Sequence, residues 1–146
     1  MTDTYLALGT NLGDRQANLD RAITLINEKV GNVVARSSVM ETAPWGFQSD
    51  NRFANMVVKV RTALPPIELL AATQAIERQM GRTEKSLNGV YHDRIIDIDI
   101  LLYGALRLET PALSIPHPLM WQRDFVMVPL RELLTEAEIE IFKSTK

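Results

Sequence analysis

Apolar and polar residues follow one another along this chain with two different periods, and the periods predict its secondary structure. Short apolar runs that are rich in β-branched residues and bounded by Gly, Pro, Asn or Asp predict strands. Such runs cover residues 5–8, 33–42, 53–62 and 94–102. Between them, apolar residues that recur every three to four positions predict helices that bury one face.

Two segments carry this helical spacing. The first begins after Asp14, whose side chain can cap a helix N-terminus, and is expected to end at Gly31. Its apolar stripe is Leu19, Ala22, Ile23 and Ile26. The second is expected to begin at Pro65 or Pro66, with Gly81 in the C′ position after its end. Its apolar stripe is Ile67, Leu70, Ala71, Ile76 and Met80.

The resulting element order up to Leu102 is βαββαβ. This order predicts an α+β fold with a ferredoxin-like core, in which both helices cover one face of an antiparallel sheet. The residues after Leu102 are expected to add a C-terminal hairpin and short helices. The 146 residues, of which 46% are hydrophobic and 23% charged, suit a single domain over residues 1–146. Because this fold hosts many functions, the function has to be argued from particular side chains.

The last predicted strand carries two acidic residues. Asp97 and Asp99 lie two residues apart, so both side chains point to one face, and the other face is expected to hold Ile96, Ile98, Ile100 and Leu102. Adjacent carboxylates repel each other, and a hard divalent cation removes that repulsion. Mg²⁺ prefers carboxylates, waters and phosphate oxygens as ligands. The strand therefore predicts a magnesium site, with a strand end bearing two solvated acids as the alternative.

Basic residues gather in the sequence around the aspartates. They are Arg78, Arg82, Lys85, Arg94, His117 and Arg123. Guanidinium groups match phosphate oxygens in geometry and charge, so their combination with a two-carboxylate strand indicates a polyphosphate ligand. A solvated surface charge is the alternative for each arginine alone. His117 lies between two prolines, which would fix the direction of its ring.

Aromatic residues are unusually frequent in the predicted loops. Six of the nine lie in or beside them: Trp45, Phe47, Phe53, Tyr91, Trp121 and Phe125. This excess suggests that a flat ring is stacked there, although core packing remains the alternative for Phe53 and Phe125. Asn55 shares a strand face with Phe53 and could offer its amide to the edge of such a ring.

Composition removes several classes of function. The net charge of −2 argues against a nucleic-acid binder, and the absence of cysteine excludes disulfides and thiolate metal sites. The N-terminal MTDTYLALGT lacks the features of a signal peptide, and no apolar run is long enough to cross a membrane. We therefore expect a cytoplasmic, monomeric protein whose partners are small molecules rather than nucleic acid or a membrane.

Several short motifs together resemble one known family. They are Leu8-Gly9-Thr10-Asn11-Leu12-Gly13, Glu41-Thr42-Ala43-Pro44-Trp45-Gly46, Phe53-Ala54-Asn55, Gln74-Ala75-Ile76-Glu77, Gly81-Arg82, the strand from Arg94 to Leu101, and Ile115-Pro116-His117-Pro118. In this order they resemble 6-hydroxymethyl-7,8-dihydropterin pyrophosphokinase, a folate-biosynthesis enzyme. The most specific part is Arg-x-x-Asp-x-Asp followed downstream by Pro-His-Pro.

The resemblance implies transfer of pyrophosphate from ATP to the pterin hydroxymethyl group, with release of AMP and with two Mg²⁺ ions as cofactors. It implies that Asp97 and Asp99 hold both ions and act in catalysis with Arg82 and Arg94. By position it implies an ATP site formed by Gln74, Glu77, Arg82, Arg94, Ile100, Ser114, His117 and Arg123. It implies a pterin site formed by Thr42, Ala43, Trp45, Phe53, Asn55 and Phe125.

Two other classes of function remain open from the residues alone. A magnesium-dependent nucleotidyl transferase or cyclase of the palm type also places two acids on such a sheet, but it releases pyrophosphate. A non-enzymatic ferredoxin-like domain that binds RNA or a small ligand is the other class. We also expect residues 82–93, which lack an apolar period, to form a mobile loop that closes over bound substrates.

Overall fold

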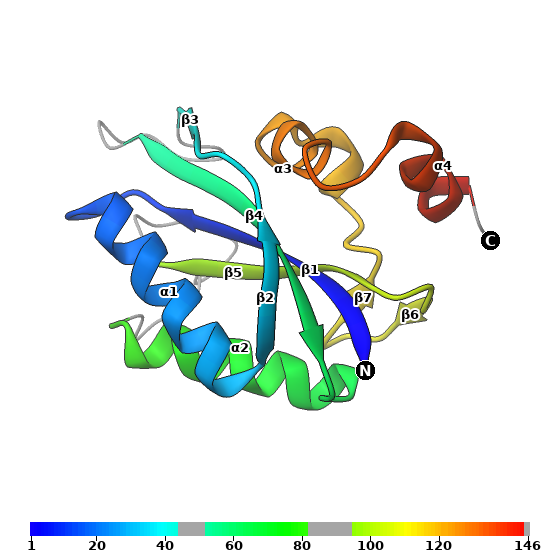
Figure 1. The fold of residues 1–146 in the computed structure, drawn as a ribbon, viewed down its shortest axis with the longest axis horizontal. Helices are drawn as coiled ribbons and strands as arrows, with labels where there is room; N and C mark the ends of the chain where they lie inside the picture. The colour runs from blue at the N-terminus through cyan, green and yellow to red at the C-terminus, as the bar shows by residue number, and fades with distance from the viewer. Residues whose placement is uncertain (44–51, 82–94, 145–146) are drawn as a thin grey trace.

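The computed structural model describes residues 1–43, 52–81 and 95–144 (Figure 1). Its strands are β1 (Thr2–Thr10), β2 (Gly31–Arg36), β3 (Met40–Thr42), β4 (Phe53–Thr62), β5 (Asp97–Tyr103), β6 (Leu108–Glu109) and β7 (Ser114–Ile115). Its helices are α1 (Arg15–Lys29), α2 (Pro66–Gln79), α3 (Asp124–Leu130) and α4 (Glu136–Ser144), with a 3₁₀ turn, η1 (Met120–Gln122), before α3. Within this part of the chain, no helix is long and apolar enough to cross a membrane.

The main sheet has the strand order β2-β4-β1-β5, and β3 also pairs with β4. Each of these pairings is antiparallel. Helices α1 and α2 cover one face of the sheet, and α3 and α4 lie on the other side (Figure 1). Strands β6 and β7 form a separate two-stranded sheet. The mixture of helices with an antiparallel sheet confirms the predicted α+β class.

Helix α1 begins as the sequence predicts. The Asp14 side chain accepts a hydrogen bond from the Ala17 backbone N–H at 3.0 Å, and the predicted apolar stripe is buried. The helix ends at Lys29 with Val30 as its C-cap, directly before Gly31 as predicted, and Gly31 is also the first residue of β2. A Cβ atom at Gly31 would lie 2.2 Å from the Arg61 carbonyl oxygen, so close pairing with β4 requires a glycine here.

Helix α2 has the predicted bounds but a different buried face. It follows Pro65, and Gly81 has a φ of +107° just after the C-cap, as predicted for a C′ residue. Two members of the predicted stripe are wrong, since Ile67 and Ala71 are exposed. The buried residues are Leu69, Thr73, Ile76 and Glu77. The helix is therefore rotated relative to the predicted stripe, and its buried face includes Glu77, which accepts a hydrogen bond from the Ile98 N–H of β5.

The predicted strand over residues 33–42 is divided into β2 and β3. The Ser37 hydroxyl accepts the Val57 backbone N–H at 2.9 Å, and the Ser37 N–H donates to the Val57 carbonyl oxygen. A side chain thus takes the place of a backbone partner, which ends the regular ladder. The strand predicted over residues 53–62 is confirmed as β4.

Strand β5 alternates as predicted over its first four residues. Ile98 and Ile100 pack in the core beneath α1 and α2, as does the preceding Ile96, and the two aspartates point away from that core. The pairing with β1 then shifts, because Tyr5 opposes Leu102 while Leu6 opposes Ile100. Leu101 is the extra residue of this β-bulge. The expectation for Leu102 is therefore wrong in its face, since Leu101 and Leu102 both pack toward α3 and α4.

Candidate active site

Three central strands bring polar side chains to one face of the sheet. Asp97 on β5 is paired with Gly9 on β1, which is paired with Asn55 on β4. Directly opposed residues of antiparallel strands share a face, so the Asp97 carboxylate and the Asn55 amide lie in one row. Two strand spacings separate their Cα atoms by about 10 Å. The neighbouring row is Asp99, Ala7 and Val57.

Gly9 lies in the middle of the first row. A Cβ atom at this position would lie 3.3 Å from the Asn55 Oδ1 atom and 3.7 Å from the Phe53 ring. A side chain here would crowd the Asn55 amide, so the close approach of Asn55 to β1 favours a glycine. The sequence predicts no site role for Ala7 or Gly9. The available signal was a pair of small residues at a spacing of two, one in the predicted strand over residues 5–8 and one directly after it.

The far end of this row is fixed by hydrogen bonds. The Asn55 Nδ2 group donates to the Thr42 hydroxyl at 2.9 Å and to the Met40 carbonyl oxygen at 3.2 Å. Both amide hydrogens are thereby used, so the Oδ1 atom is the part of Asn55 that can accept from a ligand. Phe53 is half-buried on the same face and is paired with Thr42. Ala43 follows β3 and is exposed.

His117 is held beside the bulge of β5. Its backbone N–H donates to the Leu101 carbonyl oxygen at 3.0 Å, and its Nδ1 atom accepts the Leu119 backbone N–H at 3.2 Å. A ring that accepts at Nδ1 carries its proton on Nε2 when it is neutral. Burial lowers the pKa of His117, the Arg123 charge lowers it further, and the Asp97 carboxylate opposes both. His117 therefore offers an Nε2–H donor near neutral pH.

Arg123 and Phe125 come from the start of α3. The Arg123 guanidinium carbon lies 5.5 Å from the centre of the Phe125 ring, a cation–π distance. Phe125 packs against the cluster beneath α3 and α4. This side of the sheet is also the side of Asn55 and of the two aspartates. The fold thus brings a ring from α3 and a ring from β4 to the same side of the sheet.

Strand β5 also presents a backbone edge, away from β1. Ile98 donates its backbone N–H to the Glu77 Oε2 atom at 2.8 Å. The backbone N–H and C=O of Ile98 therefore point away from β1. By the alternation of an antiparallel strand, those of Ile100 point to the same edge. The Ile100 side chain is buried in the core, so only its backbone can meet a ligand there. Gln74 is half-buried on α2, about one helical turn before Glu77.

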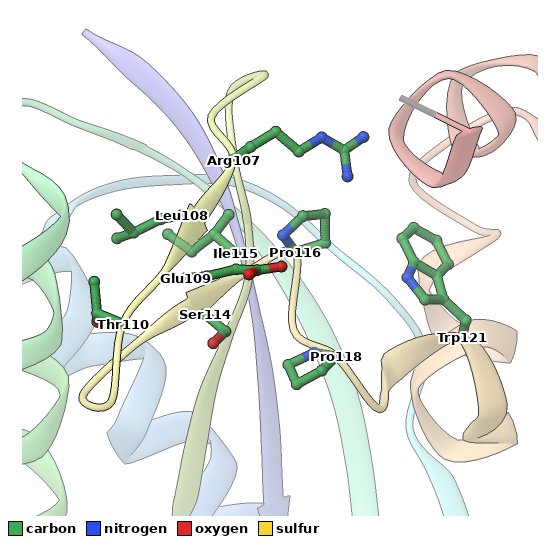
Figure 2. A pocket seen from close by; sticks show the side chains of 9 residues that line it. All are labelled: Arg107, Leu108, Glu109, Thr110, Ser114, Ile115, Pro116, Pro118 and Trp121. Carbon is green, nitrogen blue, oxygen red and sulfur yellow. The ribbon is translucent and has the colours of Figure 1, made fainter. Parts of the chain in front are cut away.

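A pocket of about 670 Å³ lies beside the β6–β7 hairpin. It is lined by Arg107, Leu108, Glu109, Thr110, Ser114, Ile115, Pro116, Pro118 and Trp121. Figure 2 shows the hairpin on one side of this space and Trp121 on the other. Arg107 donates to the Phe142 carbonyl oxygen of α4. Of the predicted ATP residues within the described part of the chain, the pocket contains only Ser114, together with the prolines on either side of His117.

Asp97 and Asp99 have the chemistry of a magnesium site. Both are half-buried on the open side of β5. Among the residues that the structure describes, no three His, Cys, Asp or Glu side chains are grouped as metal ligands. One or two carboxylates, completed by waters and substrate phosphates, are the usual protein ligands of Mg²⁺. The aspartate pair fits that ion.

Three predicted site residues, Trp45, Arg82 and Arg94, lie outside the described residues, as does the segment 82–93 for which a closing loop is expected. Their roles remain predictions. The other predicted residues form three neighbouring groups. The first group is Asp97 and Asp99 with His117 and Arg123. The second, which we call the corner, is Thr42, Phe53 and Asn55. The third lies along the edge of β5 that points away from β1, next to α2 and the β6–β7 sheet.

Comparison with known proteins finds a matching family and similar curated proteins. The family model described as 7,8-dihydro-6-hydroxymethylpterin-pyrophosphokinase (HPPK) matches residues 5–135. A 2-amino-4-hydroxy-6-hydroxymethyldihydropteridine pyrophosphokinase of Porphyromonas gingivalis is 51% identical over 134 residues, which cover 91% of each chain. The protein of the same name from Bacillus subtilis is 42% identical over 137 residues, covering 93% of this chain and 80% of its own.

Solved structures agree on the fold. The Plasmodium falciparum HPPK-DHPS wild type with SDX-DHP superposes on 98% of this chain with a TM-score of 0.73 and 16% identity. This chain spans 44% of that protein. The likeness therefore concerns the fold of the matched part.

Proposed function

Since the chain belongs to the 7,8-dihydro-6-hydroxymethylpterin-pyrophosphokinase family, we propose that its reaction takes place on the sheet face that carries Asp97, Asp99 and Asn55. The reaction is the transfer of pyrophosphate from ATP to 6-hydroxymethyl-7,8-dihydropterin in folate synthesis. The observation that carries the proposal is the row from Asp97 across Gly9 to Asn55. It offers an anionic end for metal-bound phosphates and an amide end for a ring, about 10 Å apart.

Asp97 and Asp99 are the proposed magnesium ligands, and we propose two ions. When bound, the ions offset the charge of the ATP phosphates and of the transferring group. His117 would donate its Nε2 proton to a phosphate oxygen, and Arg123 would add positive charge. Arg82 and Arg94 complete the proposed catalytic set. The contribution of the protein is thus to position and neutralise charged groups rather than to form covalent bonds.

ATP is proposed to lie along the outer edge of β5. The Ile100 backbone N–H and C=O point to that edge and match the donor and acceptor pattern of an adenine edge. Gln74 on α2 and Ser114 on β7 flank it. The pocket beside the hairpin supports this position for the nucleoside, because Ser114 and the prolines around His117 line it.

The pterin is proposed to lie in the corner of Thr42, Phe53 and Asn55. The Asn55 Oδ1 atom would accept an N–H from the pterin edge, and its orientation is set by its bonds to Met40 and Thr42. Phe53 and Phe125 would stack on the two faces of the ring. Ala43 and Trp45 complete the proposed pterin site.

The core that carries these groups is proposed to be ferredoxin-like. If β2 and β3 are counted as one interrupted strand, the element order is βαββαβ. Across the sheet the four strands then lie in the order β2/β3, β4, β1, β5. All its pairings are antiparallel, and both helices of the repeat lie on one face. We propose that β6 and β7, which pair antiparallel, are the added hairpin, and their pairing supports this proposal.

The test is product formation from ATP, Mg²⁺ and 6-hydroxymethyl-7,8-dihydropterin. We expect AMP and the pterin diphosphate in equal amounts, no AMP when the pterin is omitted, and no turnover after metal chelation. Release of pyrophosphate instead of AMP would indicate a palm-type nucleotidyl transferase. Failure to turn over any pterin alcohol would contradict the proposal.

A further inference from the structure

Glu77 is an acidic residue in an unusual environment. Only 7% of its surface is exposed, on the face of α2 that packs against the sheet. Burying a carboxylate is unfavourable unless hydrogen bonds replace the lost water. Its Oε2 atom accepts the Ile98 backbone N–H at 2.8 Å. The resemblance described above implies only that Glu77 belongs to the nucleotide site, whereas this oxygen is directed at the protein backbone.

The strand that Glu77 contacts lies at an edge of the sheet. Among the residues that the structure describes, β5 has one neighbour in the main sheet, the strand β1. On its other side its backbone N–H groups need partners, because a buried unpaired N–H is destabilising. Glu77 supplies such a partner through its Oε2 atom, which accepts the Ile98 N–H.

The residue that Glu77 holds stands between the two aspartates. Ile98 has Asp97 before it and Asp99 after it, and its side chain is buried under the helices. Ile98 is therefore fixed twice, by its side chain in the core and by its N–H on Glu77. A shift of the Ile98 backbone would move both carboxylates together, because adjacent residues of a strand share its backbone.

We infer that Glu77 is a positioning residue, which sets the spacing and direction of the Asp97 and Asp99 carboxylates through the Ile98 N–H. The inference rests on the proposed function of the two aspartates. It makes the hydrogen-bond acceptor of Glu77 essential and its negative charge secondary. A direct role of the carboxylate on the nucleotide or the metal would make the charge essential.

Two substitutions separate these roles. Glu77→Gln keeps an acceptor oxygen and removes the charge, whereas Glu77→Leu removes the acceptor and keeps a similar volume. Thr73→Val is the matched control, because Thr73 is a buried polar residue about one turn earlier on α2 whose hydroxyl bonds to Leu70 within the helix. Each full-length variant is assayed for AMP formation over a range of Mg²⁺ concentrations. Exchange of the Ile98 amide hydrogen is measured by NMR on the ligand-free protein.

The Leu variant should lose about tenfold or more in kcat and need more Mg²⁺ for half-maximal rate, with the KM for ATP within about threefold of wild type. Its Ile98 amide should exchange faster. Thr73→Val should stay within about threefold of wild type in kcat, and the Gln variant should keep at least about fivefold more of its kcat than the Leu variant.

Two results would overturn the inference. One is a Gln variant as impaired as the Leu variant while its Ile98 amide stays protected, since this assigns the effect to the charge. The other is a Leu variant with unchanged magnesium dependence. If the Leu variant does not fold, the Gln variant alone decides between charge and acceptor. Wild-type AMP formation tests the proposed function separately.

Discussion

The face of the sheet beneath α3 and α4 has two halves of opposite character. In the covered half, Tyr5, Val57, Leu101 and Leu102 pack against apolar side chains of η1, α3 and α4. In the other half, Gly9, Asn55, Asp97 and Asp99 carry little apolar surface. On this face of β1, Tyr5 belongs to the covered half and Gly9, four residues later, belongs to the polar half. The site thus occupies the part of the sheet where small and polar residues replace a packed core.

One strand contributes both to the packed core and to the polar half. The isoleucines of β5 stabilise the helix-covered face, and its aspartates, on the opposite face, are free of that packing role. Substitutions in the polar half should therefore change activity more than stability, and substitutions in the core should do the reverse.

The largest effect is expected from Asp97→Ala and from Asp99→Ala. Each should lower kcat by about 10³-fold or more, because metal-held charge neutralisation contributes several kcal/mol to phosphoryl transfer. The fold should survive, and the melting temperature of the ligand-free protein should be unchanged or higher, since two adjacent carboxylates no longer repel each other. AMP formation at saturating Mg²⁺ and thermal melting are the measurements. Retention of most activity in either variant would contradict the magnesium assignment.

The converse effect is expected from Ile26→Ala. Ile26 is fully buried beneath the sheet face opposite the site. Removal of its branched side chain leaves a cavity, and the free energy of unfolding should fall by about 2–5 kcal/mol. Urea unfolding measures this change. The kcat per folded molecule should equal that of wild type, and a fall in kcat without loss of stability would break the proposed separation.

A smaller effect is expected from Asn55→Ala. The variant should bind the pterin about 10- to 100-fold more weakly, because a site that bonds a ring edge loses its acceptor, while ATP binding should change less than about twofold. Calorimetric titration with each ligand separately measures both affinities. Asn32→Ala, at an exposed position of β2, is the control. Equal losses for both ligands would mean that Asn55 is structural.

The sequence predicts what depends on local period and misses what depends on partner strands. The alternation of two predicted that Asp97 and Asp99 share a face. The face of Leu102 was wrong because the bulge at Leu101 exists only in the register with β1. The end of α1 before Gly31 was predicted, but the close approach of Gly31 to the Arg61 backbone was not, because Arg61 lies far along the chain.

The same limit applies to the candidate site. Asp97, Asp99, Asn55 and His117 carry recognisable chemistry, so their residue types alone point to them. Gly9 matters because it has no side chain, and this can be recognised only when its neighbours across the sheet, Asn55 and Phe53, are known. The bond from Ile98 to Glu77 joins residues 21 apart, and no spacing rule within one element predicts it.

The smallest expected effect concerns a surface contact at the pterin end. The Arg15 Nη1 atom lies 2.6 Å from the Glu41 carboxylate and donates to the Arg52 carbonyl oxygen at 3.0 Å. It therefore ties the strand that carries Thr42 to the residue before Phe53. The side chains of Arg15 and Glu41 are 34% and 52% exposed, and an exposed ion pair contributes at most about 1 kcal/mol.

Arg15→Ala should accordingly raise the KM for the pterin about two- to fivefold, leave the KM for ATP unchanged, and matter less at high salt, where the pair is screened. Steady-state kinetics with each substrate varied at low and high ionic strength measure this. Arg131→Ala removes a similarly exposed pair with Glu136, after α3, and should change neither KM. If both variants change the KM for the pterin equally, the change is caused by the lost positive charge. The contact of Arg15 with Glu41 and Arg52 would then not affect the pterin end of the polar half.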